Sequence, residues 1–205
     1  MPTLGRMSFS IAERARLVQS LLSVGPDAPT LCEGWTAHHL AAHLLIRERK
    51  LLATAGMFVP PLSGITDRAM ASQLGRPFED VVQEWGRGPR GAWKLIDKKV
   101  NVAEHFVHHE DVRRPQGMEA RGFSTPEIAE LYAALRTASA AFGQSSAVVE
   151  LWPHGQLPIY AGDRHAAERV QIHGDVGELL LYTFGRPVLK LDFVGNEELV
   201  RRRSV

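Results

Sequence analysis

Apolar positions recur every three or four residues through the first half of the chain, a spacing that predicts helices. The first helix is expected over residues 10–23, where Ser10 and Glu13 have the spacing of a capping box. A second helix is expected from a Thr36 N-cap to about residue 55. Its packed stripe consists of Leu40, Leu44 and Leu51.

The middle of the chain is more interrupted. Prolines and glycines punctuate residues 60–76, so this stretch is expected to be a long loop that could cover a site. A third helix is expected from about Phe78, carrying Trp85, Trp93 and Ile96 and broken or kinked by the glycines between them. A fourth helix is expected from residue 101 until a proline at position 115.

The pattern changes after residue 117. Ser124 and Glu127 form a second capping-box spacing and open a helix that runs to about Gly143. Short β-like stretches follow at residues 147–152, 157–161, 168–173 and 189–194, with a short helix at 176–184 between the last two. This order predicts a mainly α protein, an antiparallel four-helix bundle over residues 8–116 followed by a small α+β domain over residues 117–205.

Composition narrows the classes of function. The 205 residues carry 24 basic and 23 acidic side chains, a net charge of +1, so no nucleic acid or membrane partner is expected. No stretch matches a signal peptide or a membrane span, and Cys32 is the single cysteine, which excludes an internal disulfide. We therefore expect a cytoplasmic protein, as a monomer or homodimer.

The expected fourth helix holds the most concentrated chemistry. Glu104 and His108 are four residues apart and share one helix face, which is partly apolar. A carboxylate on such a face is costly unless it is paired or bound to a metal. His43 from the second helix would complete a His/Glu/His set and leave a fourth position open, as in catalytic zinc sites. Nickel, iron and manganese also suit these ligand types.

Spacing alone leaves alternatives open. Glu104 could be the capping-box glutamate of its own helix, paired with Asn101. His105 with His109, and His39 with His43, are further pairs at a spacing of four, so several ligand sets are possible. The same histidines could also be partly exposed residues of a helix surface.

Two short motifs resemble a known family. Residues 32–36, CEGWT, followed by residues 40–44, LAAHL, look like the N-terminal motif of the mycothiol-dependent maleylpyruvate isomerase family, which belongs to the DinB-like metal-binding four-helix bundles. The E-x-x-x-H-x-x-D run of residues 104–111 is similar to its second signature. Residues 174–186 resemble the helix and Gly-Arg that end its smaller C-terminal domain.

The resemblance implies His43, Glu104 and His108 as metal ligands and mycothiol as a co-substrate. It also implies Arg186 as a residue that binds an anionic substrate, because a guanidinium pairs with carboxylates in a bidentate way. Two other arginines are weaker candidates, Arg47 and Arg113. Asp111 could orient a ligand histidine. Cys32 is expected to be idle, since no histidine or acid can be tied to it from the sequence.

Three functions remain open at this stage. The first is a metal-dependent enzyme that activates a small thiol of the mycothiol type for transfer to, or isomerisation of, a small electrophile. The second is a metal-dependent hydrolase that uses metal-bound water, with His39 or His105 as the base. The third is a non-catalytic metal-binding protein, in which a fourth protein ligand would close the site. Residues 60–100 match no motif of the family.

Overall fold

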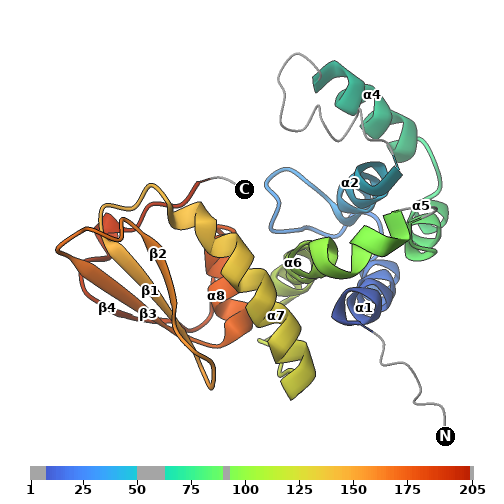
Figure 1. Cartoon of the computed structure of the whole chain (residues 1–205). Coiled ribbons are helices and arrows are strands. Elements are labelled where there is room, and N and C mark those ends of the chain that lie inside the picture. Colours follow the sequence, from blue (N-terminus) through green and yellow to red (C-terminus); the bar gives the residue numbers. More distant parts are fainter. Residues whose placement is uncertain (1–7, 50–62, 90–92, 204–205) are drawn as a thin grey trace, which may run out of the picture. The chain divides into compact units, whose positions relative to one another are not determined.

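The computed structural model describes residues 8–49, 63–89 and 93–203, with only the backbone described for residues 63 and 93–100. The chain separates into two compact units, residues 1–118 and 119–205 (Figure 1). Each unit has its own secondary structure and its own interior, so the two are described separately.

The N-terminal unit is a bundle of helices around one apolar core. Its elements are α1 (Phe9–Val24), α2 (Ala37–Arg49), α4 (Ser63–Leu74), α5 (Phe78–Gly86) and α6 (Trp93–Arg113), followed by the short 3-10 helix η2 (Arg114–Gln116). α1, α2, α5 and α6 supply the core, and α6 packs mainly against α1 while meeting α2 along a shorter stretch (Figure 1). The largest fully buried core side chains include Leu17, Leu40, Leu44 and Trp85.

α6 begins earlier than the sequence pattern indicated. Its backbone is helical from Trp93, so Asn101 lies inside the helix and the capping-box interpretation of Asn101 and Glu104 is wrong. Instead, the Asn101 side chain accepts a hydrogen bond from Arg47 and the Glu104 carboxylate pairs with the same arginine. Trp93 therefore belongs to α6 and not to the third predicted helix, which ends as α5 at Gly86.

Two other local expectations are also wrong. Residues 63–74 form α4, not a loop, because prolines flank this segment without interrupting it, and Ala69 packs on Ile46 of α2. The N-cap of α1 is Ser8, so Ser10 lies within the helix and is buried. Residues 50–62, which include the predicted end of the second helix and part of the predicted loop, lie outside the described residues.

The C-terminal unit is a four-stranded sheet covered by helices. Its strand order is β2-β1-β3-β4, with β1 parallel to β3 and antiparallel to β2, and β3 antiparallel to β4. α8 packs against β1 and β3, and α7 packs on α8 (Figure 1). The bounds are α7 (Thr125–Ala138), η3 (Ser139–Phe142), β1 (Val148–Pro153), β2 (Ile159–Gly162), β3 (Arg169–Gly174), α8 (Val176–Thr183), β4 (Asp192–Val194) and η4 (Glu197–Leu199).

Local sequence explains this unit well. The capping box predicted at Ser124 and Glu127 is present, with Ser124 Oγ 2.7 Å from Glu127 Oε2. Val170 and Ile172 alternate with more exposed residues along β3 and are fully buried against the helices. The predicted fold class is confirmed: a mainly α chain, with a bundle whose core comes from four helices followed by a small α+β domain.

Within the part of the chain that the structure describes, no helix has both the length and the apolar character that a membrane span requires.

Candidate metal site

The three predicted ligands lie together on two helices of the bundle. His43 projects from α2, and Glu104 and His108 project from successive turns of α6. Glu104 Oε1 lies 3.6 Å from His43 Nε2 and 3.2 Å from His108 Nε2. One ligand atom from each residue falls within 4.8 Å of the other two. The three donors thus face one point, although His43 lies 61 positions before Glu104 in the sequence. The i, i+4 spacing placed the other two, Glu104 and His108, on the same face of α6.

The carboxylate at this point is ionised. Burial raises the pKa of Glu104, but hydrogen bonds from His108 and His43 and the charge of Arg47 outweigh it and hold this pKa well below its ordinary value. Arg47 Nε lies 2.9 Å from Glu104 Oε1, and Arg47 Nη1 donates to Asn101 Oδ1 at 2.8 Å. Arg47 therefore orients the carboxylate that both histidines face.

The two histidines differ in protonation. Burial lowers the pKa of His43 and outweighs its hydrogen bond with Glu104, so His43 is neutral at pH 7. Burial also lowers the pKa of His108, but hydrogen bonds with Asp111, Cys32 and Glu104 raise it well above its ordinary value. A metal that binds His108 must therefore displace a proton, and metal affinity should increase with pH.

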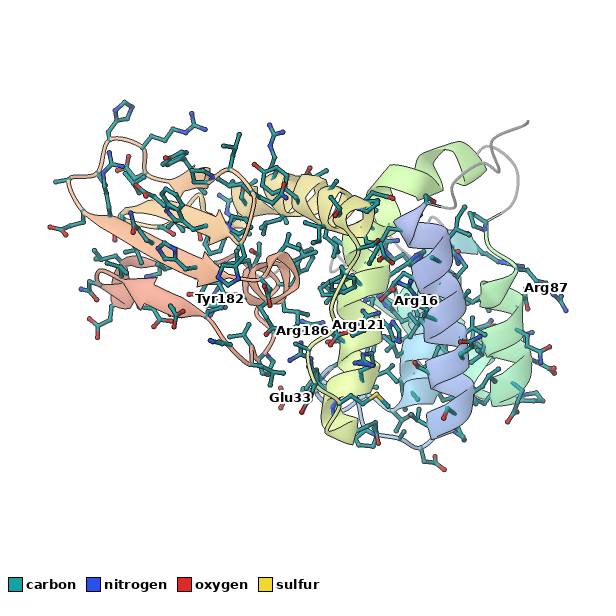
Figure 2. The ribbon with its side chains drawn as sticks, turned by 90° about the horizontal axis from the view of Figure 1, so that it is seen from below. Arg16, Glu33, Arg87, Arg121, Tyr182 and Arg186 are labelled. Carbon is teal, nitrogen blue, oxygen red and sulfur yellow. The ribbon has the colours of Figure 1, made fainter. Side chains whose placement is uncertain are left out.

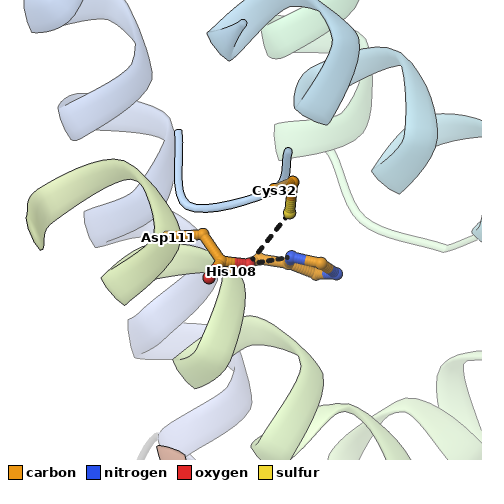
Figure 3. A group of neighbouring side chains, drawn as sticks. All are labelled: Cys32, His108 and Asp111. Atoms are coloured by element: carbon orange, nitrogen blue, oxygen red, sulfur yellow. Dashed lines mark hydrogen bonds and ion pairs between the residues drawn. The ribbon is translucent and has the colours of Figure 1, made fainter. Parts of the chain in front are cut away.

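Asp111 and Cys32 lie behind His108. Asp111 Oδ2 is 2.9 Å from His108 Nδ1 and accepts a hydrogen bond from Cys32 Sγ at 3.2 Å (Figure 3). The Asp111 side chain is fully buried. Cys32 lies in the connector between α1 and α2, and Leu31 of that connector donates its backbone N–H to the Asp111 carbonyl at 2.9 Å. The sequence could not tie Cys32 to an acid or a histidine, and the structure pairs its thiol with Asp111.

The second histidine pair of α6 faces α1 and does not join the ligand set. His105 Nδ1 donates to the Ser10 carbonyl at 2.9 Å. His109 Nδ1 donates to Glu13 Oε1 at 2.7 Å, and its Nε2 lies 2.8 Å from Ser20 Oγ. Both rings are buried, so these interactions are part of the packing between α1 and α6.

The remaining candidates have other surroundings. His39 Nδ1 lies 3.0 Å from Thr36 Oγ1 at the start of α2, and Arg113 pairs with Glu110 at 3.2 Å. Arg186 lies just after α8 in the C-terminal unit, where its Nη1 donates to the Phe184 carbonyl at 3.2 Å (Figure 2).

The chemistry of the converging donors fits a divalent metal. Two imidazole nitrogens and one carboxylate oxygen are ligands that zinc accepts, and three protein ligands leave a position for water or substrate. The three side chains are 11 to 18% exposed, so the point they face is shielded yet reachable. The same donor set also suits other first-row metals.

Comparison with known proteins identifies a family match within the N-terminal helical bundle. Residues 10–90 match the family model of the mycothiol maleylpyruvate isomerase N-terminal domain. Residues 10–90 are a domain of this family. His43 lies within the matched residues, whereas Glu104 and His108 follow them on α6. The resemblance seen in the sequence motifs is thereby confirmed at the level of the family.

Two solved structures resemble nearly the whole chain in fold. A crystal structure of the mycothiol-dependent maleylpyruvate isomerase is similar with a TM-score of 0.55 and 15% identity, covering 95% of this chain and 94% of that one. A histidine-to-alanine mutant of the isomerase gives a TM-score of 0.59 and 16% identity over the same shares. At this identity the likeness concerns the fold. No curated protein sequence matches the chain significantly.

Proposed function

We propose that this protein is an isomerase or transferase that activates a low-molecular-weight thiol of the mycothiol type at a metal site. The observation that carries the proposal is the convergence of His43, Glu104 and His108 on one point. The isomerase-family domain over residues 10–90 and the shared fold supply the class of reaction. The substrate is a small electrophile.

Each of the three residues has a defined role in this proposal. His43 and His108 would present Nε2 to the metal, and Glu104 would supply one carboxylate oxygen. A bound zinc ion would lower the pKa of a coordinated thiol and keep it as the nucleophilic thiolate. Arg47 holds Glu104 in place, and the shielding of the three side chains limits access of water. Arg186 remains the proposed contact for a substrate carboxylate.

The hydrolase alternative has less support. It needs a base beside the open metal position, and His39 and His105 were its candidates. His39 Nδ1 contacts Thr36 Oγ1 at the start of α2, and His105 is buried with Nδ1 on the Ser10 carbonyl. Neither residue belongs to the ligand sets found among the described residues.

Cobalt substitution tests the proposal directly. Cobalt(II) replaces zinc in such sites and makes thiolate coordination visible as a near-ultraviolet charge-transfer band. We expect mycothiol to produce this band in the Co²⁺-loaded wild type, and to lose it in His43→Ala. His39→Ala, one turn earlier on α2, is the matched control and should keep it.

Two outcomes would overturn the proposal. One is a wild type that binds no cobalt or zinc. The other is a metal-loaded wild type whose spectrum mycothiol leaves unchanged while it hydrolyses ester substrates, which would establish the hydrolase.

A further inference from the structure

His108 belongs to two possible ligand sets at once. One set is His43, Glu104 and His108 itself, and the other combines His108 with Cys32 and Asp111. His108 uses Nε2 in the first set and Nδ1 in the second. The second set includes the single cysteine and a fully buried aspartate, so it is either a second metal site or a support for the first.

Distances separate the two possibilities. Two ligand atoms bound at about 2.1 Å to a tetrahedral ion lie about 3.4 Å apart. The separations in the first set, 3.6 and 3.2 Å, lie on either side of that value. His108 Nδ1 and Asp111 Oδ2 are only 2.9 Å apart, the length of an N–H···O hydrogen bond. A thiol donor also approaches that same oxygen at 3.2 Å.

We propose that Asp111 is a positioning residue, which keeps a proton on His108 Nδ1 and thereby leaves Nε2 facing Glu104 and His43. Which nitrogen of a histidine can bind a metal is determined by the hydrogen bond that the other nitrogen makes. The proposal rests on the proposed metal site for its functional meaning, but the orientation of His108 exists without a metal.

Cys32 supports Asp111 and is not a ligand. Its thiol donates to the carboxylate oxygen that His108 contacts (Figure 3). The connector that carries Cys32 is held at the same residue by the hydrogen bond from the Leu31 N–H to the Asp111 carbonyl. The carboxylate therefore has a second donor that limits its rotation and keeps Oδ2 toward His108.

The first test needs no metal. Nitrogen-15 NMR of the metal-free protein, at a pH high enough to make the ring neutral, identifies which nitrogen of His108 carries the proton. We expect Nδ1–H in the wild type and a change toward Nε2–H in Asp111→Ala. Glu110→Gln is the matched control, because Glu110 is a buried carboxylate of α6 that pairs with Arg113 and Arg114 instead.

The second test measures metal binding. We expect Asp111→Asn to bind zinc about 10–100-fold more weakly, the usual effect of losing a residue that orients a ligand, with Glu110→Gln unchanged at equal folded fraction. Cys32→Ser should leave the visible spectrum of bound cobalt unchanged, and wild type without added thiol should show no thiolate band.

These tests separate this proposal from the proposed function. A wild type that binds no metal but keeps the Asp111-dependent proton on Nδ1 supports the positioning role and overturns the metal-dependent function. A proton on Nε2 in the wild type, or one on Nδ1 that persists in Asp111→Ala, overturns the positioning role. A thiolate band that Cys32→Ser removes, or two zinc ions per chain, would identify the second ligand set as a metal site and overturn it as well.

Discussion

Two faces of α6 each carry a polar pair at a spacing of four residues and use it differently. Toward α1, His105 and His109 are 0% and 3% exposed, and each binds its own partners. Toward α2, Glu104 and His108 are 18% and 11% exposed as side chains, and they meet His43 at a single carboxylate oxygen. The first arrangement joins two helices, whereas the second concentrates donors at one point.

The comparison teaches that a spacing of four residues does not by itself identify a site. His105 and His109 donate to the Ser10 carbonyl and to Glu13, so their polar atoms are used in stabilising the fold. At the other face, Nε2 of His43 and Nε2 of His108 both lie within 3.6 Å of Glu104 Oε1, and a metal ion could replace these contacts. Convergence with partial exposure distinguishes the candidate site from the structural pair.

The largest effect is expected on metal binding. His43→Ala removes one of the three ligands. Zinc affinity should therefore fall by more than about 100-fold, which exceeds the loss expected when a residue that only supports a ligand is changed. The free energy of unfolding should change by about 1 kcal/mol or less, because Glu104 keeps Arg47 as a partner. Chelator competition and urea denaturation measure the two quantities. If His43→Ala kept the zinc affinity of the wild type, the face of α6 toward α2 would not be a metal site and would no longer differ from the face toward α1.

On the face of α6 toward α1, we expect the opposite: a loss of stability with no change in zinc affinity. His109→Ala leaves the fully buried Glu13 without its 2.7 Å partner, although Arg16 still lies 3.2 Å from it, and should cost about 3 kcal/mol of unfolding free energy. The Arg16 side chain is 44% exposed, so it lies largely outside this packing. Zinc affinity should be unchanged in the folded protein. A stable variant that has lost metal would show that His109 acts at the site.

Zinc should stabilise only proteins that keep all three proposed ligands, His43, Glu104 and His108. A ligand that binds the native state at 100 times its dissociation constant adds about 2.7 kcal/mol to the unfolding free energy. We expect this gain in the wild type and its reversal by a chelator. The same zinc concentration should have no effect on the thermal midpoint of His43→Ala. An equal gain in both proteins would indicate binding elsewhere on the chain.

The smallest effect concerns acid stability at Glu48 of α2, which lies 3.4 Å from His105 and 2.8 Å from Arg14. Burial raises the pKa of Glu48, but hydrogen bonds from His105 and Arg14 outweigh it and lower this pKa below its ordinary value. A carboxyl whose folded pKa is lowered stabilises the protein above its unfolded pKa, about 4.3, and loses that contribution as pH falls through the folded pKa.

Glu48→Gln removes this contribution. The difference in unfolding free energy between wild type and Glu48→Gln should therefore be constant near neutral pH and shrink below about pH 4.3. Urea denaturation at several pH values measures it. A difference that grows as pH falls would contradict the lowered pKa of Glu48.

Much of this arrangement follows from local sequence, but the partners do not. The spacing of Glu104 and His108 places both on one face wherever the helix begins, so the error in its start had no effect on this pair. The start itself was misjudged because Asn101 and Glu104 match a cap, while their actual partner is Arg47 on another helix.

Long-range contacts set the limit of sequence reasoning here. The hydrogen bond from Cys32 to Asp111 joins residues 79 positions apart, and no periodicity in either segment indicates it. In the same way, His105 and His109 differ from the ligand pair through the partners that neighbouring helices, mainly α1, present to them. The sequence spacing predicts which residues share a helix face. Whether a face forms a metal site or only packs against another helix depends on the packing of the helices, which the spacing does not predict.

One measurement tests the central claim most directly, namely metal content of the tag-free wild type, His108→Ala and His109→Ala after exposure to zinc. These two residues are neighbours on α6 but lie on its different faces. We predict about one zinc per chain in the wild type and in folded His109→Ala, and none in folded His108→Ala. No zinc in the wild type, or equal loss in both variants, would contradict the account.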